Sequence, residues 1–184
     1  MGENVIGRGN IVEIVQYEVD IGGWKMKMFE KARRSPGVRC IVENAEWKIL
    51  LSKEWRYELE AWDFRLPGGK VFDSLDEYKE FLESGKDIEP LVLEAGKNEL
   101  REEVGILAQS ALFFFKKVCG ATMEWDLYYV VVKEWSFADG HDQGEGEQID
   151  GFEWYGKDEV RDMLEQGKVD EGRSVATLLY YISG

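Results

Sequence analysis

The sequence has 184 residues, a formal net charge of −14 and 13% aromatic residues. A chain of this length and aromatic content can build one self-sufficient hydrophobic core, which excludes an intrinsically disordered protein. The strong negative charge repels phosphate backbones and anionic lipid surfaces, so we expect neither nucleic acid nor a membrane as partner. Two cysteines without metal-site spacing and a single histidine argue against a zinc site or a disulfide scaffold. A soluble, cytoplasmic protein is the expectation.

The first 35 residues predict a small N-terminal β element. Residues 11–19 are rich in β-branched side chains, and residues 24–29 alternate apolar and basic side chains after the Gly22–Gly23 turn. The two segments are therefore expected to pair as strands, before Ser35-Pro36-Gly37 breaks the pattern. We assign residues 1–35 to this element and residues 36–184 to the main domain.

The N-terminal element is also a possible dimer interface. Its strands would expose Trp24, Met26 and Met28 on one face. This is a large apolar surface for a free β-hairpin, and such surfaces mark interaction sites. We therefore expect a homodimer.

The main domain mixes strands and helices without regular alternation, which is typical of a mixed sheet flanked by helices. Strands are expected over residues 38–42 and 48–52, paired with each other across Asn44, and over 112–118, 127–133 and 152–155. Helices are expected over 75–82, from 87 or 88 to 104, over 158–166 and over 173–182. A sharp turn at residues 66–70 and a glycine-rich, polar loop at 137–147 connect these elements.

One predicted helix carries a run of three glutamates near its end. At 100° per residue, Glu99, Glu102 and Glu103 share one edge of this helix. Like charges one turn apart repel, and the C-terminal end of a helix prefers cations. A hard, oxygen-preferring cation would relieve both costs. For an isolated pattern, the plainer interpretation is a solvated acidic face partnered by Lys97 and Arg101.

The surroundings of the glutamates resemble a known family. The segment Glu99-Leu100-Arg101-Glu102-Glu103-Val104-Gly105-Ile106 matches the second half of the Nudix signature, and Pro67-Gly68-Gly69-Lys70 resembles the loop that opens it. The resemblance implies an α/β fold of the Nudix type, an α/β/α sandwich on a mixed sheet. It further implies that Glu99, Glu102 and Glu103 bind Mg²⁺, with Mn²⁺ as an alternative, that Glu102 and Glu103 are catalytic, and that Gly68 and Gly69 bind substrate.

Two departures from the signature leave a non-catalytic protein open. Counted from Gly69, the signature arginine falls at position 83, whereas the matching position is 98, so about 15 residues are inserted near 73–89. We expect this insertion to be peripheral. The arginine itself, which in the family orients a metal-binding glutamate, is replaced by Asn98.

Weaker similarities point to the ADP-ribose pyrophosphatase-like branch of the family. They lie in residues 34–38, 51–56, 146–154 and 172–179. The resemblance implies hydrolysis of ADP-ribose, or a related nucleoside diphosphate sugar, to a nucleoside monophosphate and a sugar phosphate. The alternatives are a binding module of the same fold that senses a nucleotide sugar, and a hydrolase of nucleoside triphosphates.

Two further residues have expected roles in this reaction. Arg56 can hold a phosphate through two parallel hydrogen bonds, although a surface ion pair with Glu54 or Glu58 is an equally ordinary fate for it. Glu147, or secondly Glu145, is the candidate general base in the acidic loop, against the alternative of a solvated loop. The substrate is expected to be a small nucleoside diphosphate compound.

Overall fold

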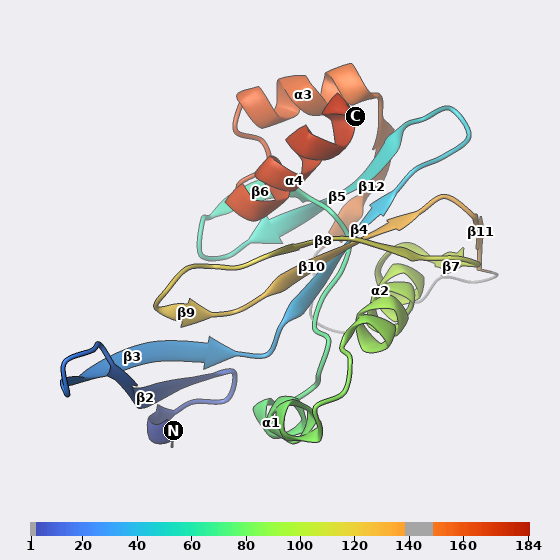
Figure 1. Ribbon diagram of the computed structural model, residues 1–184. Coiled ribbons are helices and arrows are strands. Elements are labelled where there is room, and N and C mark those ends of the chain that lie inside the picture. The colour runs from blue at the N-terminus through green and yellow to red at the C-terminus, as the bar shows by residue number, and fades with distance from the viewer. Residues whose placement is uncertain (1–2, 139–148) are drawn as a thin grey trace.

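The computed structural model describes residues 3–138 and 149–184 (Figure 1). The described strands are β1 (Glu3–Arg8), β2 (Val12–Asp20), β3 (Met26–Arg34), β4 (Gly37–Val42), β5 (Ile49–Arg56), β6 (Ala61–Arg65), β7 (Ile106–Ala108), β8 (Leu112–Lys117), β9 (Met123–Glu124), β10 (Leu127–Val132), β11 (Trp135–Phe137) and β12 (Ile149–Tyr155). The described helices are α1 (Leu75–Ser84), α2 (Glu89–Val104), α3 (Lys157–Glu165) and α4 (Gly172–Ser183).

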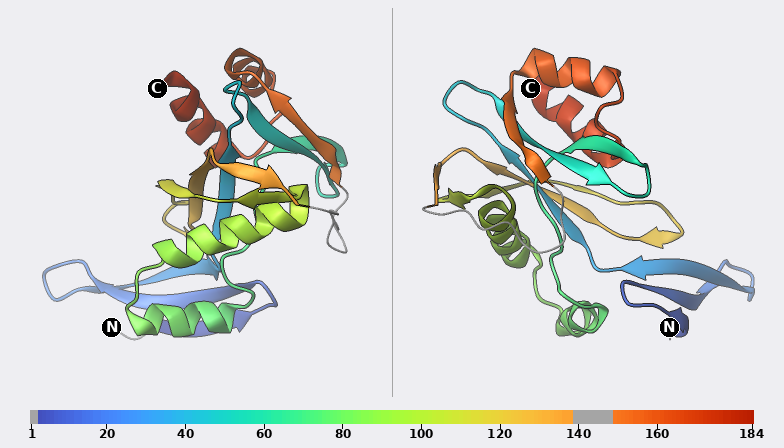
Figure 2. Two further views of the ribbon diagram at one scale, coloured as in Figure 1. Left: turned by 90° about the vertical axis from the view of Figure 1, so that its right-hand side faces the viewer. Right: turned by 180° about the vertical axis from the view of Figure 1, so that it is seen from behind.

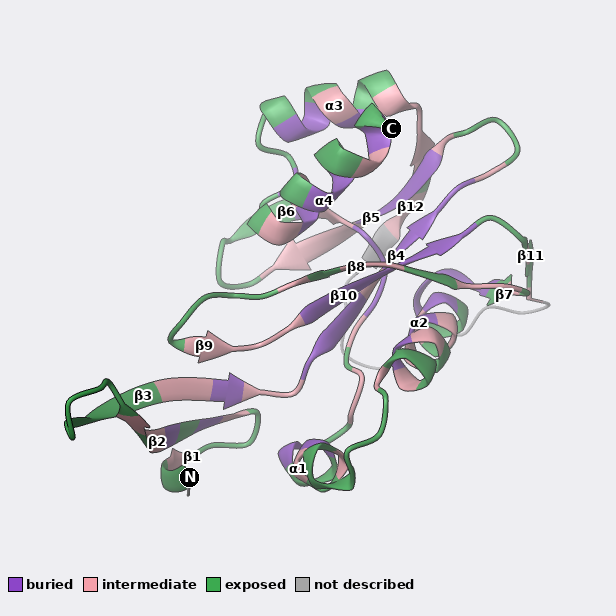
Figure 3. Cartoon of the chain, viewed as in Figure 1, coloured by how far each residue is buried: buried purple, intermediate pink, exposed green. Residues whose placement is uncertain are grey.

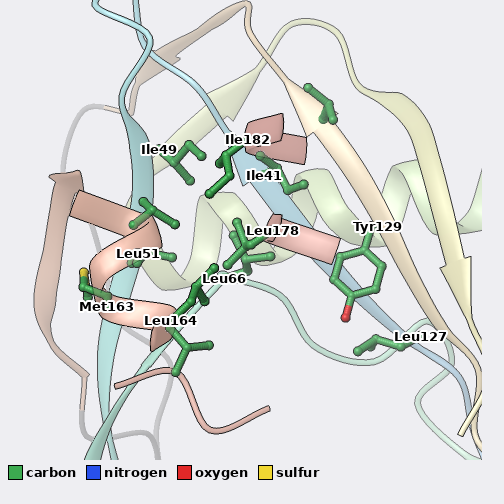
Figure 4. Close-up of a cluster of buried hydrophobic side chains, with 13 residues drawn as sticks. Ile41, Ile49, Leu51, Leu66, Leu127, Tyr129, Met163, Leu164, Leu178 and Ile182 are labelled. Carbon is green, nitrogen blue, oxygen red and sulfur yellow. The ribbon is translucent and has the colours of Figure 1, made fainter. Parts of the chain in front are cut away.

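The central strands β4 and β10 are buried on both faces. Successive side chains of a strand point to opposite faces, and here they enter two separate apolar clusters. Tyr129 of β10 and Ile41 of β4 join the cluster that α3 and α4 cover, shown in Figure 4. Val130 and Cys40 join the cluster that α2 covers. Figure 3 shows the resulting buried band between the two helical layers, which is the predicted sandwich.

The sheet at the centre is mixed, as predicted. β10 pairs in parallel with β4 and antiparallel with β8. β5 lies in a second, antiparallel sheet between β12 and β6. The predicted pairing of residues 38–42 with 48–52 is therefore wrong. An isolated bridge between Glu43 and Ile49 is the one ladder contact described between these two segments. Each strand pairs along its length with other strands instead, β4 with β10 and β5 with β12 and β6.

The N-terminal strands form a sheet that also takes in a strand of the main domain. β2 pairs with β3 over its whole length and with β1 over residues 13–17, and β9 adds to the free edge of β3 in parallel. Figure 2 shows this sheet beside α1, away from α3 and α4. Met26 and Met28 are about half exposed at its outer end. The division into residues 1–35 and 36–184 stays a prediction.

The insertion near residues 73–89 contains helix α1. Ser74 caps the start of this helix, since its side chain accepts a hydrogen bond from the Glu77 N–H. Tyr78 is buried, and the Lys79 ammonium lies 2.8 Å from the carboxylate of Glu13 in β2. The insertion is thus tied to the N-terminal sheet.

Several short strands were not predicted from the sequence. β1, β6, β7, β9 and β11 lack a clear apolar alternation, and three of them have two or three residues. The predicted loop at 137–147 begins inside β11, and its residues 139–147 lie outside the described part of the chain. None of the described helices is long and apolar enough to cross a lipid bilayer.

Candidate active site

Helix α2 packs one narrow stripe of side chains against the central strands. Val92, Gly96, Leu100 and Val104 are buried along it, and the neighbouring Leu93 is half-buried. The helix ends at Gly105, which adopts a φ of 65° and donates its N–H to the Leu100 carbonyl.

Gly96 lets the helix approach the sheet closely. A Cβ at this position would lie 3.1 Å from both the Cys40 Sγ and a methyl group of Val130. This contact is tighter than ordinary van der Waals packing. The close approach fixes the height of the glutamates above the strands.

The loop after β6 passes over the start of β4 and is held there by backbone hydrogen bonds. The Val38 N–H donates to the Gly69 carbonyl at 2.9 Å, and the Cys40 N–H donates to the Pro67 carbonyl at 2.8 Å. Gly68 between them has a φ of 139°, and a Cβ there would come within 3.0 Å of the Arg39 Cα. Arg39 also donates a hydrogen bond to the Gly68 carbonyl. Only glycine fits this position.

Two of the three glutamates reach this loop. The Gly68 N–H donates to Glu103 Oε2 at 2.8 Å, and the Lys70 N–H donates to Glu99 Oε1 at 3.1 Å. Glu103 is 7% exposed, so its carboxylate lies in the wall of the site and not on a solvated face. The backbone of the loop therefore orients both carboxylates. In the family resemblance, part of this role belongs to the arginine that Asn98 replaces here.

Gly69 leaves room for one of these carboxylates. A Cβ on residue 69 would lie 2.5 Å from Cδ of Glu99, which is far closer than any real contact. The Glu99 side chain thus occupies the space that a side chain at position 69 would need. A glycine is required by this contact and not by its backbone conformation.

Glu102 is placed differently from the other two glutamates. Its side chain is 59% exposed and lies 3.2 Å from the Arg101 guanidinium. It still lines the same cavity as Glu99 and Glu103. The three glutamates are therefore together in one site, with two bound to the loop and one at the rim.

The donor chemistry of this edge fits Mg²⁺, which prefers carboxylate oxygens and retains several waters. The described side chains, however, are not arranged closely enough to form a metal centre. Among residues 3–138 and 149–184, no group of three or more acidic, histidine or cysteine side chains is close enough to hold an ion. The metal roles of Glu99, Glu102 and Glu103 therefore stay predictions.

The glutamates and several arginines line one cavity of about 550 Å³. Gly68, Gly69 and Arg56 line this cavity, as their predicted roles require. The remaining lining residues are Arg34, Ser35, Pro36, Gly37, Arg39, Glu54, Arg65, Lys70, Asp73, Trp125 and Leu127. The cavity is thus lined by both carboxylates and cations, a combination suited to a metal ion together with an anionic ligand.

Arg56 lies where it could bind a phosphate, and it also forms the ion pairs with Glu54 and Glu58 that were considered as the alternative. It lines the cavity, and it also donates from Nε to Glu58 Oε1 at 2.9 Å and lies 3.6 Å from Glu54. Burial alone would lower the pKa of Arg56, but the hydrogen bond to Glu58 and the nearby charges of Glu58, Glu54 and Asp63 together outweigh it and raise this pKa. Arg56 is therefore cationic at any physiological pH.

Several residues that line the cavity were not predicted from the sequence. Arg39 had a usable signal, because it is the one charged residue in the apolar run from Val38 to Val42. Arg65 and Trp125 had none, since they reach the cavity only through the pairing of β6 and the path of the chain after β9. Glu147, the predicted general base, lies outside the described residues.

Comparison with known proteins supports the fold. The chain is similar to a crystal structure of an ADP compounds hydrolase, with a TM-score of 0.68, 18% sequence identity, and coverage of 97% of this chain and 89% of that chain. No family model and no curated protein sequence matches the chain. At such low identity the similarity shows the fold alone. The chain has a mixed α/β fold of the Nudix hydrolase type, as predicted.

Proposed function

We propose that this protein is a magnesium-dependent pyrophosphohydrolase. Its substrate would be ADP-ribose or a related nucleoside diphosphate sugar, and its products a nucleoside monophosphate and a sugar phosphate. The observation that carries the proposal is the attachment of Glu99 and Glu103 to the backbone of the Gly68–Lys70 loop, inside a cavity that arginines also line. The similarity in fold to a hydrolase of ADP compounds supports the choice of substrate class.

The acidic and the basic residues of the cavity would have different roles in the chemistry. Glu99, Glu102 and Glu103 would hold Mg²⁺, or Mn²⁺, which neutralises charge on the phosphate oxygens and lowers the pKa of a bound water. Arg56 would bind a non-bridging phosphate oxygen, and Gly68 and Gly69 would let the loop backbone approach the substrate. Glu147 remains the candidate general base. The protein is further proposed to act in the cytoplasm as a homodimer.

The proposal is tested by following products directly. Purified protein is incubated with Mg²⁺ and a panel of ADP-ribose, ADP-glucose, a dinucleotide and nucleoside triphosphates, and the products are read by ³¹P nuclear magnetic resonance. We expect two phosphomonoester signals from ADP-ribose and no reaction in chelator. Release of inorganic pyrophosphate from triphosphates, with no cleavage of ADP-ribose, would show instead that the protein is a hydrolase of nucleoside triphosphates.

A second candidate is a binding module that does not cleave its ligand. It is favoured by Asn98 in place of the signature arginine. It is also favoured because, among the described residues, no three acidic, histidine or cysteine side chains lie close enough to hold an ion. Saturable binding of ADP-ribose in calorimetry, with no product over a long incubation with Mg²⁺ or Mn²⁺, would establish it in place of the enzyme.

A further inference from the structure

Two arginines that line the cavity, Arg34 and Arg39, have no acidic partner among the described residues, and of these Arg39 bonds to the Gly68 carbonyl. Arg34, at the end of β3, lines the cavity and is partly buried. Within the described part of the chain it forms no side-chain hydrogen bond and no ion pair. Its guanidinium instead stacks on Trp125, whose ring centroid lies 4.3 Å from the guanidinium carbon.

The neighbouring basic residues are already engaged. Arg65 faces Glu54 and Asp63, and Arg56 faces Glu54 and Glu58. Of the other two, Arg39 bonds to the Gly68 carbonyl and Lys70 lies 3.7 Å from Asp73. Among the basic residues that line the cavity, Arg34 therefore carries the least compensated positive charge.

The surroundings of Arg34 add positive potential. Burial lowers its pKa, and the nearby charges of Arg173, Arg39 and Arg56 lower it further. An arginine nevertheless stays protonated at neutral pH. A cation held among other cations, partly out of water, gains strongly from an anion that enters the cavity.

Trp125 holds Arg34 in place. The same indole also carries the guanidinium of Arg173, whose carbon lies 4.2 Å from the ring centroid. Arg173 is anchored by the Glu171 carboxylate and the Trp125 carbonyl, and it does not line the cavity. A flat guanidinium stacked on an indole keeps its N–H donors directed outward from its edges, free for an incoming oxyanion.

We infer that Arg34 is an anion receptor of this cavity, that it binds a phosphate or pyrophosphate group directly, and that Trp125 is its positioning residue. The inference rests on the proposed function for the choice of ligand. The receptor itself needs no metal ion. The glutamate edge requires a cation before it can accept a phosphate, whereas Arg34 accepts the anion on its own. The inference thereby narrows the substrate class to compounds with an anionic group that can reach Arg34.

The test is binding of inorganic pyrophosphate to metal-free protein, measured by calorimetry in chelator and at low salt. Arg34→Met keeps an apolar stem on the indole and removes the charge. We expect its dissociation constant to rise about tenfold or more, as for one lost charged hydrogen bond. Arg34→Lys keeps the charge without the flat stack and should fall between the two.

Arg161→Met removes an exposed arginine of α3 and serves as the control. It should bind pyrophosphate within about threefold of wild type, because Arg161 does not line the cavity. Equal binding by wild type and Arg34→Met, or no binding by wild type in chelator, would overturn the inference. Should Arg34→Met fail to fold, Arg34→Lys together with the salt dependence of wild-type binding decides the matter.

Turnover of ADP-ribose, measured separately, distinguishes the two proposals. Protein that binds pyrophosphate through Arg34 but hydrolyses no substrate would refute the enzyme and leave the receptor standing. The opposite result has two parts: the protein hydrolyses ADP-ribose with the same kcat/KM in wild type and Arg34→Met, and it binds no pyrophosphate without metal. This result would support the enzyme and refute the receptor.

Discussion

Gly68 and Gly69 are adjacent glycines that are needed for different reasons. Gly68 has a positive φ, and its missing Cβ makes room for the backbone of β4. Gly69 has no such backbone requirement, and its missing Cβ makes room for the carboxylate of Glu99. One glycine therefore serves the fold, while the other serves the site.

This difference predicts opposite outcomes for two alanine variants. In Gly69→Ala only the flexible Glu99 side chain must move, so the free energy of unfolding should change by less than about 1 kcal/mol, or about 2–4 °C in melting temperature. Turnover should fall on the order of 10²-fold, because a displaced site group loses its geometry. Kinetics and thermal unfolding measure the two quantities.

Gly68→Ala is the matched comparison. Its positive φ alone costs about 1–3 kcal/mol, and the contact with β4 adds to this, so the variant should be clearly destabilised. Normal turnover in a folded Gly69→Ala protein would contradict the placement of Glu99 against the loop.

The glutamates were predictable as a group, because helical spacing puts them on one edge. Their separate environments were not. The burial of Glu103 and its bond to the Gly68 N–H depend on a loop that lies 35 residues away in the sequence. No local pattern contains that information.

Helix α1 is more than the peripheral insertion expected from the sequence. Glu13 is fully buried in β2, and its carboxylate faces Arg33 at 3.4 Å and Lys79 of α1 at 2.8 Å. Arg8 of β1 pairs with Asp76 of the same helix at 2.8 Å. Two ion pairs, Lys79 with Glu13 and Asp76 with Arg8, therefore link the insertion to the N-terminal sheet.

Lys79→Met should destabilise the protein. Removing one partner of a buried ion pair costs about 3–5 kcal/mol, and because Arg33 remains near Glu13 we expect about 2 kcal/mol or slightly more. Lys86→Met, an exposed lysine of the same insertion, is the control and should change little. Chemical denaturation compares them.

The double variant Glu13→Leu with Lys79→Met sharpens this test. It removes both charges, so no buried carboxylate is left unpaired, and part of the lost stability should return. Equal stability of Lys79→Met and Lys86→Met would show that the buried contact contributes nothing.

The start of helix α4 has a pH-sensitive cap. Glu171 accepts the Ser174 N–H at 2.7 Å and faces Arg173 at 2.8 Å. Burial alone would raise the pKa of Glu171, but the hydrogen bonds from Arg173 and Ser174 outweigh it and lower this pKa below its usual value of 4.5.

The sign of the effect on stability follows from this shift. The folded state holds the proton less tightly, so the contribution is fully present above pH 4.5 and is lost as the pH falls through the lowered folded-state pKa. Glu171→Gln should therefore be less stable than wild type at pH 7, by about 1–2 kcal/mol. The gap should narrow on acidification. A gap that stays constant across a pH series of urea titrations would contradict the cap.

The whole fold was predictable where apolar patterns are long. The α/β class, the described helices and the core strands 38–42 and 127–133 follow from periodicity, since both strands bury two faces and read as continuous apolar runs. The pairing of β4 with β10 was not predictable, because about 85 residues separate them and a nearby segment offers a simpler hairpin. The two-residue β9 owes its existence to the edge of β3.

At the scale of the assembly, the outer end of the N-terminal sheet predicts a dimer. Trp24 is fully exposed, and Met26 and Met28 lie on one face of β3. Sedimentation velocity should show twice the mass of one chain. Met28→Glu should shift the protein toward monomer, because a charge in an apolar interface is costly to bury. A wild-type monomer at tens of micromolar would remove the dimer from the account.

The central claim is that the edge of α2 at the Gly68–Lys70 loop performs hydrolysis. The most direct measurement is kcat/KM for ADP-ribose in Glu103→Gln, beside Glu94→Gln on the exposed face of the same helix. The amide oxygen of the Glu103→Gln variant can still accept the Gly68 N–H, so the fold is kept while the charge is lost. We predict a fall on the order of 10² or more for Glu103→Gln, and no more than about twofold for Glu94→Gln. Activity of Glu103→Gln within threefold of wild type would contradict the account.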